Sequence, residues 1–60
     1  ASEPLLTAKQ EVALAQRIQR GLGAAELLET YGDLPWEQVR QLQSLVDDGQ
    51  AAREHLGRAN

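Results

Sequence analysis

The sequence predicts an all-α fold, a small bundle of three to four short helices. Apolar residues recur at spacings of three and four along most of the chain, and no segment alternates apolar and polar residues with a period of two. Glycines and a proline divide these apolar stretches into short segments. With 60 residues and no internal repeat, the chain is expected to form a single helical domain, 1–60, with a thin core.

The first helix is predicted at about 7–20. Thr7 and Gln10 have the spacing of a capping box, in which each side chain accepts a hydrogen bond from the other residue's backbone amide. Gly21 follows a turn that contains Arg17 and Arg20, cations that are favourable near a helix C-terminus. We therefore expect Gly21 to cap the end of this helix.

The second helix is predicted at about 23–31. Ala24, Leu27, Leu28 and Tyr31 share one helical face, and Gly32 suits the C-cap. Because about two turns of helix do not persist alone, its leucines are expected to pack on the Leu14 stripe of the first helix.

The third helix is predicted at about 35–48. Pro35 suits a first helical position, and Asp33 or Leu34 precedes it where an N-cap would lie. Asp47 and Asp48 are unfavourable at a helix C-terminus but favourable at the N-terminus of a following helix, which predicts a boundary at Asp48–Gly49.

The fourth helix is predicted at about 50–60, with Ala52, His55, Leu56 and Ala59 on one face. Residues 1–4 are expected to be flexible, and Ala1 and Ser2 are left out of the fold prediction. The predicted core consists of the large apolar residues at helical spacing: Leu14, Ile18, Leu22, Leu28, Trp36, Val39, Leu42, Val46 and Leu56.

Composition excludes several classes of protein. The sequence has no cysteine and therefore neither a disulfide framework nor a thiolate metal site. No apolar run approaches the length of about 20 residues that a membrane span needs, and the start lacks the order of a signal peptide. We expect a soluble cytoplasmic protein without membrane contact. The net charge of −3 has the wrong sign for a domain that grips phosphates by its overall charge.

No catalytic or metal-binding motif is present in the sequence, and the single histidine, His55, has no acidic partner at ligand spacing. We expect no enzyme activity, no cofactor, no metal and no small-molecule substrate, and a half-buried His55 without a role. Trp36 could anchor a partner or a nucleic-acid base, but its spacing with Val39 and Leu42 favours the core.

Three cations, Lys9, Arg17 and Arg20, gather roughly on one side of the first predicted helix. They form either a solvated face or a surface that meets phosphates, and the spacing does not decide between the two. Arg53 and Arg58 lie on the last predicted helix, where Arg53 could instead pair with Glu37 or an aspartate.

Two motifs resemble a known family. Residues 4–21, PLLTAKQEVALAQRIQRG, are similar to PLLTxEEEVELAxRIxxG, the opening of region 1.2 in primary bacterial sigma factors of the sigma-70 family. Residues 49–60, GQAAREHLGRAN, are similar to GExARxxLIxANLRLV, the entry into region 2.1 of the same proteins. The order and approximate spacing of the two motifs also agree with that family.

The resemblance implies a role in transcription initiation. Sigma factors bind core RNA polymerase and direct it to promoter DNA, and region 1.2 packs beside region 2 and contacts the discriminator DNA. On this basis Lys9, Arg17 and Arg20 become candidates for contact with DNA or polymerase. Lys9–Gln10 replaces a more acidic pair of the family, and Gly57 replaces a large apolar residue, which weakens the last predicted helix.

Two hypotheses therefore stand. The first is a region 1.2 module of a sigma factor that contacts discriminator DNA, core RNA polymerase or both, with weak or no DNA binding by this segment alone. The second is a stand-alone sigma-like module that binds a protein and does not contact DNA. The paired motifs favour the first, whereas the negative net charge and the absence of the family's DNA-reading helix before Pro4 favour the second.

Overall fold

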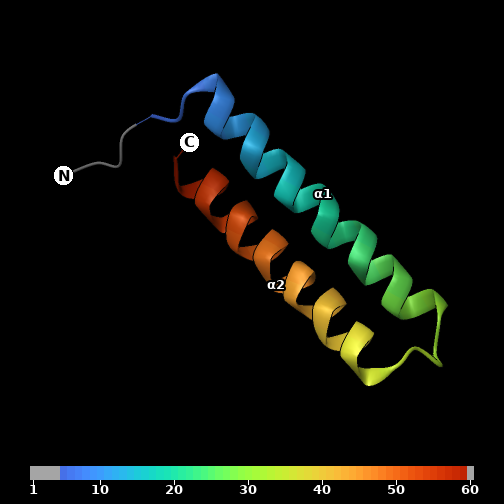
Figure 1. Ribbon diagram of the computed structural model, residues 1–60. Coiled ribbons are helices and arrows are strands. Elements are labelled where there is room, and N and C mark those ends of the chain that lie inside the picture. Colours follow the sequence, from blue (N-terminus) through green and yellow to red (C-terminus); the bar gives the residue numbers. More distant parts are fainter. Residues whose placement is uncertain (1–4, 60) are drawn as a thin grey trace.

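The computed structural model describes residues 5–59, which form two long helices rather than three or four. Helix α1 spans Ala8–Thr30 and helix α2 spans Trp36–Ala59. The two helices run antiparallel and lie side by side along their whole length, so that the end of α2 returns to the start of α1 (Figure 1). The all-α prediction is confirmed for the described residues, and the predicted number of helices is wrong.

The start of α1 follows the sequence prediction. The amide of Gln10 donates to Thr7 Oγ1 at 3.1 Å, and the amide of Thr7 donates to Gln10 Oε1 at 2.9 Å. This reciprocal pair is the predicted capping box, and it satisfies two backbone amides at the start of the helix. The helix ends at Thr30, after which the Tyr31 amide donates to the Leu27 carbonyl at 3.0 Å.

Gly21 does not end a helix but lies inside α1, and Gly49 lies inside α2. The predicted breaks at 21–23 and at Asp48–Gly49 are therefore wrong. A Cβ placed on Gly21 would lie 3.0 Å from the Cα of Gly49, and one placed on Gly49 would lie 3.1 Å from the carbonyl oxygen of Arg17. The two glycines are thus the place where the helix backbones touch, and their lack of a side chain is used for packing rather than for a left-handed cap. No residue within 5–59 has a positive φ, Gly32 included, so neither Gly21 nor Gly32 is a left-handed cap.

Residues 31–35 connect the helices. The carbonyl of Pro35 accepts hydrogen bonds from the amides of Gln38 at 2.9 Å and Val39 at 3.0 Å, so the helical hydrogen bonding of α2 begins there. The predicted start at Pro35 is confirmed to within one residue. Helix α2 then continues through Asp47 and Asp48, where the sequence predicted an end.

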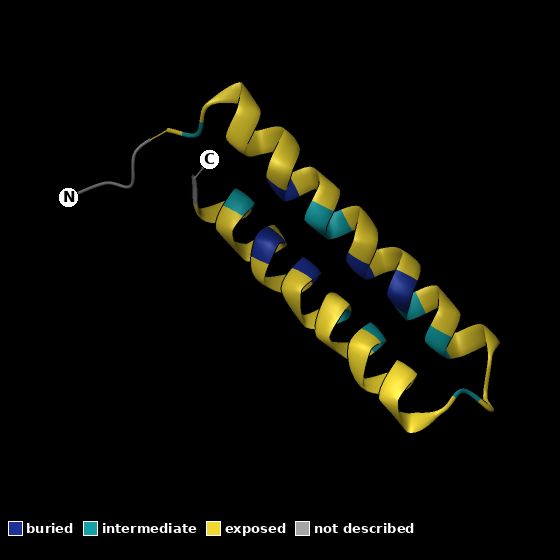
Figure 2. Cartoon of the chain, in the orientation of Figure 1, coloured by how far each residue is buried: buried dark blue, intermediate teal, exposed yellow. Residues whose placement is uncertain are grey.

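The core is a narrow seam between the helices, where the darkest residues of Figure 2 face each other. Its buried apolar side chains within 5–59 are Leu14, Ala24 and Ala52, with exposed fractions of 5%, 3% and 0%. Five further predicted core residues are half-buried: Ile18, Leu28, Leu42, Val46 and Leu56. Small residues at the centre and leucines toward both ends therefore make up the seam.

Three predicted core residues are exposed instead. Trp36 is 64% exposed because it begins α2, beyond the last turn of α1, and its ring lies under the guanidinium of Arg40 at 5.2 Å. Leu22 and Val39 are 50% and 38% exposed, because each lies on a flank of its helix rather than on the line through Gly21 and Gly49. Helical spacing predicts that such residues share a face with their neighbours, but it does not determine which face of the helix packs against the other helix.

Residues 1–4, for which flexibility was predicted, lie outside the described part of the chain. Within 5–59, neither helix is long and apolar enough to cross a membrane.

Candidate functional site

An ion pair bridges the two helices beside the contact between the glycines. Arg17 Nε donates to Asp48 Oδ2 at 2.9 Å, and Arg17 Nη2 donates to Asp48 Oδ1 at 2.7 Å. Nη2 also lies 3.4 Å from the backbone carbonyl of Asp48. The guanidinium therefore grips the carboxylate with two nitrogens, the geometry that makes arginine selective for carboxylates and phosphates.

The close backbone contact positions this pair. Asp48 precedes Gly49 directly, and Arg17 lies one turn before Gly21, so both side chains start next to the point where the backbones touch. The side chains remain accessible to water, with 36% of Arg17 and 48% of Asp48 exposed. This is the one ion pair found among residues 5–59.

Each partner shifts the titration of the other. The hydrogen bonds from Arg17 lower the pKa of Asp48, partial burial opposes this, and the positive charges of Arg17 and Arg20 lower it further. The same hydrogen bonds raise the pKa of Arg17. Asp48 therefore stays ionised, and its carboxylate lies within the electrostatic reach of Arg20 as well as of Arg17.

The predicted cations lie along one flank of α1, which we call the basic flank and define as Lys9, Arg17 and Arg20. At about 100° per residue, Arg17 and Arg20 are about 60° apart around the helix, and Lys9 lies about three turns before Arg20 on the same side. All three belong to α1. The structure thus brings the predicted set onto one surface but binds the guanidinium of Arg17 to Asp48.

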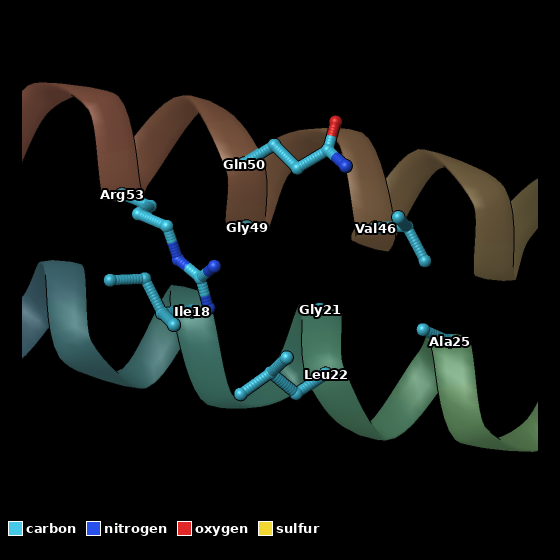
Figure 3. Close-up of a pocket in the computed structure, with 8 residues that line it drawn as sticks. All are labelled: Ile18, Gly21, Leu22, Ala25, Val46, Gly49, Gln50 and Arg53. Atoms are coloured by element: carbon cyan, nitrogen blue, oxygen red, sulfur yellow. The ribbon is translucent and has the colours of Figure 1, made fainter.

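The other flank of the seam carries an apolar groove. Its walls are Ile18, Leu22 and Ala25 from α1 and Val46, Gln50 and Arg53 from α2, with Gly21 and Gly49 at its base (Figure 3). In this view the Arg53 side chain reaches from α2 toward Ile18 on α1. The predicted alternative pairing of Arg53 with Glu37 or an aspartate is not found among the described residues.

A second apolar surface lies at the connected end of the hairpin. We call it the loop-end patch and define it as Leu27, Tyr31, Leu34, Leu42 and Leu45, which line one groove together with Gln38 and Gln41. Leu27, Tyr31 and Leu45 are 44%, 56% and 39% exposed. Such a group of exposed large apolar side chains is typical of a surface that contacts another protein.

His55 is exposed rather than half-buried, which corrects that prediction. It lines a groove at the open end of the hairpin with Leu5, Leu6 and Arg58 among its neighbours. No group of three or more histidine, aspartate or glutamate side chains within residues 5–59 could hold a metal ion.

Sequence reasoning missed Asp48 as the partner of Arg17. The signal that could have found it is a seven-residue spacing that passes through both glycines: Leu14, Gly21 and Leu28 in α1, and Leu42, Gly49 and Leu56 in α2. Such a spacing predicts two uninterrupted helices, and an antiparallel arrangement centred on the glycines brings Arg17 and Asp48 together.

Comparison with known proteins gives two kinds of match. Residues 1–24 match the family model of the sigma-70 factor, region 1.2. The chain is 48% identical over 61 residues to the RNA polymerase principal sigma factor HrdC of Streptomyces coelicolor, and this alignment covers 95% of the chain. It is 38% identical over 61 residues to the principal sigma factor HrdD of the same organism, and this alignment covers 100% of the chain.

The chain spans 18% of the length of each of these relatives. No solved structure matches the chain significantly. The region 1.2 match ends at residue 24, within α1, whereas the similarity to the principal sigma factors continues through the connection and α2. Residues 1–24 therefore have the sequence of region 1.2 of the sigma-70 family, and the chain as a whole is similar to principal sigma factors.

Proposed function

We propose that this chain acts in transcription initiation as the region 1.2 module of a sigma factor, in which the basic flank contacts the phosphates of discriminator DNA. The observation that carries the proposal is that Lys9, Arg17 and Arg20 all fall within residues 1–24, the part that matches region 1.2. Their helical spacing puts the three on one side of α1, and none of them is among the residues that line the apolar groove.

The contact is expected to be weak for the chain by itself. The net charge of −3 opposes approach to a polyanion, and three cations offer few phosphate contacts. In a sigma factor bound to core RNA polymerase, the polymerase and the other regions would hold the DNA nearby, so that a weak local contact suffices. This role is not enzymatic and belongs to the cytoplasm, where bacterial RNA polymerase transcribes.

A direct test measures the binding of a fluorescently labelled single-stranded discriminator oligonucleotide across a salt series. The double variant Arg17→Ala plus Arg20→Ala is expected to bind more weakly and to reduce the slope of log K against log salt by about 1.4, from about 0.7 for each lost phosphate contact on a single strand. The matched control is Arg40→Ala plus Arg53→Ala, which removes the same charge from α2. Equal losses in both double variants would show only an effect of net charge and would refute the basic flank as the contact.

A second function is favoured by the loop-end patch. Its exposed leucines and Tyr31 are typical of a surface that binds a protein. The negative net charge of the chain favours a module that does not bind DNA. Leu27→Gln plus Leu45→Gln should then weaken binding to purified core RNA polymerase while oligonucleotide binding stays absent in every variant. Oligonucleotide binding that depends on Arg17 and Arg20 would contradict this second function.

A further inference from the structure

Asp48 occupies the atoms of Arg17 that a phosphate would use. Its two carboxylate oxygens take the hydrogen bonds of Nε and Nη2 at 2.9 Å and 2.7 Å, as two phosphate oxygens would. Within the basic flank, the paired donors Nε and Nη2 of Arg17 are therefore already bound to a carboxylate from the other helix.

We propose that Asp48 is a built-in competitor for the anion site of the basic flank, so that DNA phosphate binds the Nε–Nη2 edge of Arg17 only by displacing the Asp48 carboxylate. The inference rests on the function proposed above and adds its regulation. It assigns to Asp48, a residue of α2, control over contacts made by α1.

The exposure of the pair makes displacement feasible. With 36% of Arg17 and 48% of Asp48 open to water, a released carboxylate would be solvated rather than buried without a partner. The helices would also stay together, because the contact between Gly21 and Gly49 involves backbone atoms and not these side chains. A phosphate can therefore take the guanidinium without opening the hairpin.

Asp48 also acts on Arg20. The positive charge of Arg20 is close enough to help keep Asp48 ionised, so the carboxylate offsets part of the field of both arginines. Replacing Asp48 by a neutral residue therefore frees Nε and Nη2 of Arg17 and raises the positive potential around both Arg17 and Arg20.

The test compares Asp48→Asn with Asp47→Asn in the oligonucleotide assay. Both variants remove one negative charge at adjacent positions of α2, but the carboxylate of Asp47 accepts a hydrogen bond from Gln43 Nε2 at 3.2 Å on its own helix and does not touch Arg17. Asp48→Asn is expected to bind on the order of three- to tenfold tighter than the parent with a steeper salt dependence, and Asp47→Asn less than about twofold tighter. The combination Asp48→Asn plus Arg17→Gln should lose the gain.

A second measurement follows the ion pair directly. The Nε–H resonance of Arg17 in a nitrogen-15 NMR spectrum should shift in Asp48→Asn, where its carboxylate acceptor is lost, and should stay near the parent position in Asp47→Asn. In the parent it should shift when oligonucleotide is added, because a phosphate oxygen replaces the carboxylate oxygen as acceptor. Far-UV circular dichroism checks that Asp48→Asn remains helical, and Asp48→Ala is the replacement if it does not.

The outcomes separate the two proposals. Binding that needs Arg17 and Arg20 but is equally affected by Asp48→Asn and Asp47→Asn would overturn the competitor and leave the proposed function standing. A gain that persists in the combination with Arg17→Gln would also overturn it. Binding that is indifferent to Arg17 and Arg20 would overturn both.

Discussion

At the scale of single residues, the two glycines determine what the neighbouring side chains can do. Gly21 and Gly49 bring the helix backbones into contact, and this closeness lets the short side chain of Asp48 reach Arg17 across the seam. Leucines at these positions would hold the helices at the usual separation of about 8–10 Å and break both contacts. The ion pair between Arg17 and Asp48 therefore depends on Gly21 and Gly49 having no side chains.

The first prediction compares two glycines of α1. Gly21→Ala should destabilise the chain by about 1–3 kcal/mol, because the new Cβ would lie 3.0 Å from both the Cα of Gly49 and the carbonyl oxygen of Leu45, which are backbone atoms that cannot rotate away. Gly23→Ala should stabilise it by up to about 1 kcal/mol, because nothing lies within 4 Å of the added Cβ and alanine favours helix. Urea unfolding followed by circular dichroism measures both. Equal stabilisation by the two changes would contradict the close contact.

The second prediction concerns pH. Because Arg17 lowers the pKa of Asp48 in the folded chain, the ion pair contributes its full stabilisation above the ordinary Asp pKa of 3.8 and loses it as the pH falls from there through the lower folded value. Arg17 stays charged throughout, because the ordinary pKa of an arginine lies far above this pH range and Asp48 raises it further. The thermal midpoint of the parent should therefore drop more steeply below pH 3.8 than that of Asp48→Asn, whereas Asp47→Asn should keep the steep drop.

At the scale of the helices, the sequence predicted starts better than ends. The capping box at Thr7 and Gln10 and the start near Pro35 depend on local hydrogen bonds and φ restrictions, which neighbouring residues determine. Whether Gly21 ends a helix or packs inside one depends on Gly49, a residue far along the chain, and local propensity carries no information about that contact. For the same reason Arg17 was found as a candidate but its partner Asp48 was not.

The third prediction tests the helix start. Thr7→Ala should lower stability by about 1 kcal/mol and loosen the first turn of α1, because the amide of Gln10 loses its acceptor. Amide hydrogen exchange of residues 8–11 should accelerate selectively. Thr30→Ala, the same change at the other end of α1, has no capping bond to lose and should leave these amides unchanged. Similar exchange in both variants would argue against the cap.

At the scale of the whole molecule, the hairpin divides into a seam and two unlike flanks. One flank carries Lys9, Arg17 and Arg20, and the other carries the groove around Ile18 and Leu22. With two helices and no third layer among residues 5–59, most large apolar side chains can be covered only on one side. Their exposure is therefore a consequence of the architecture, and it leaves surfaces that a larger assembly could cover.

The thin seam also makes the molecule sensitive at few positions, which the last prediction tests. A chain of this length is expected to have a total stability of roughly 3–9 kcal/mol. Leu14→Ala removes a large side chain that is only 5% exposed and should cost about 2–5 kcal/mol, enough to unfold much of the population at room temperature. Leu27→Ala makes the same change in the same helix at a position that is 44% exposed, and should cost less than about 1 kcal/mol. Far-UV circular dichroism and urea titration distinguish them. Equal losses of stability would mean that the loop-end patch contributes to the fold as much as the seam does, and would remove the basis for treating it as a docking surface.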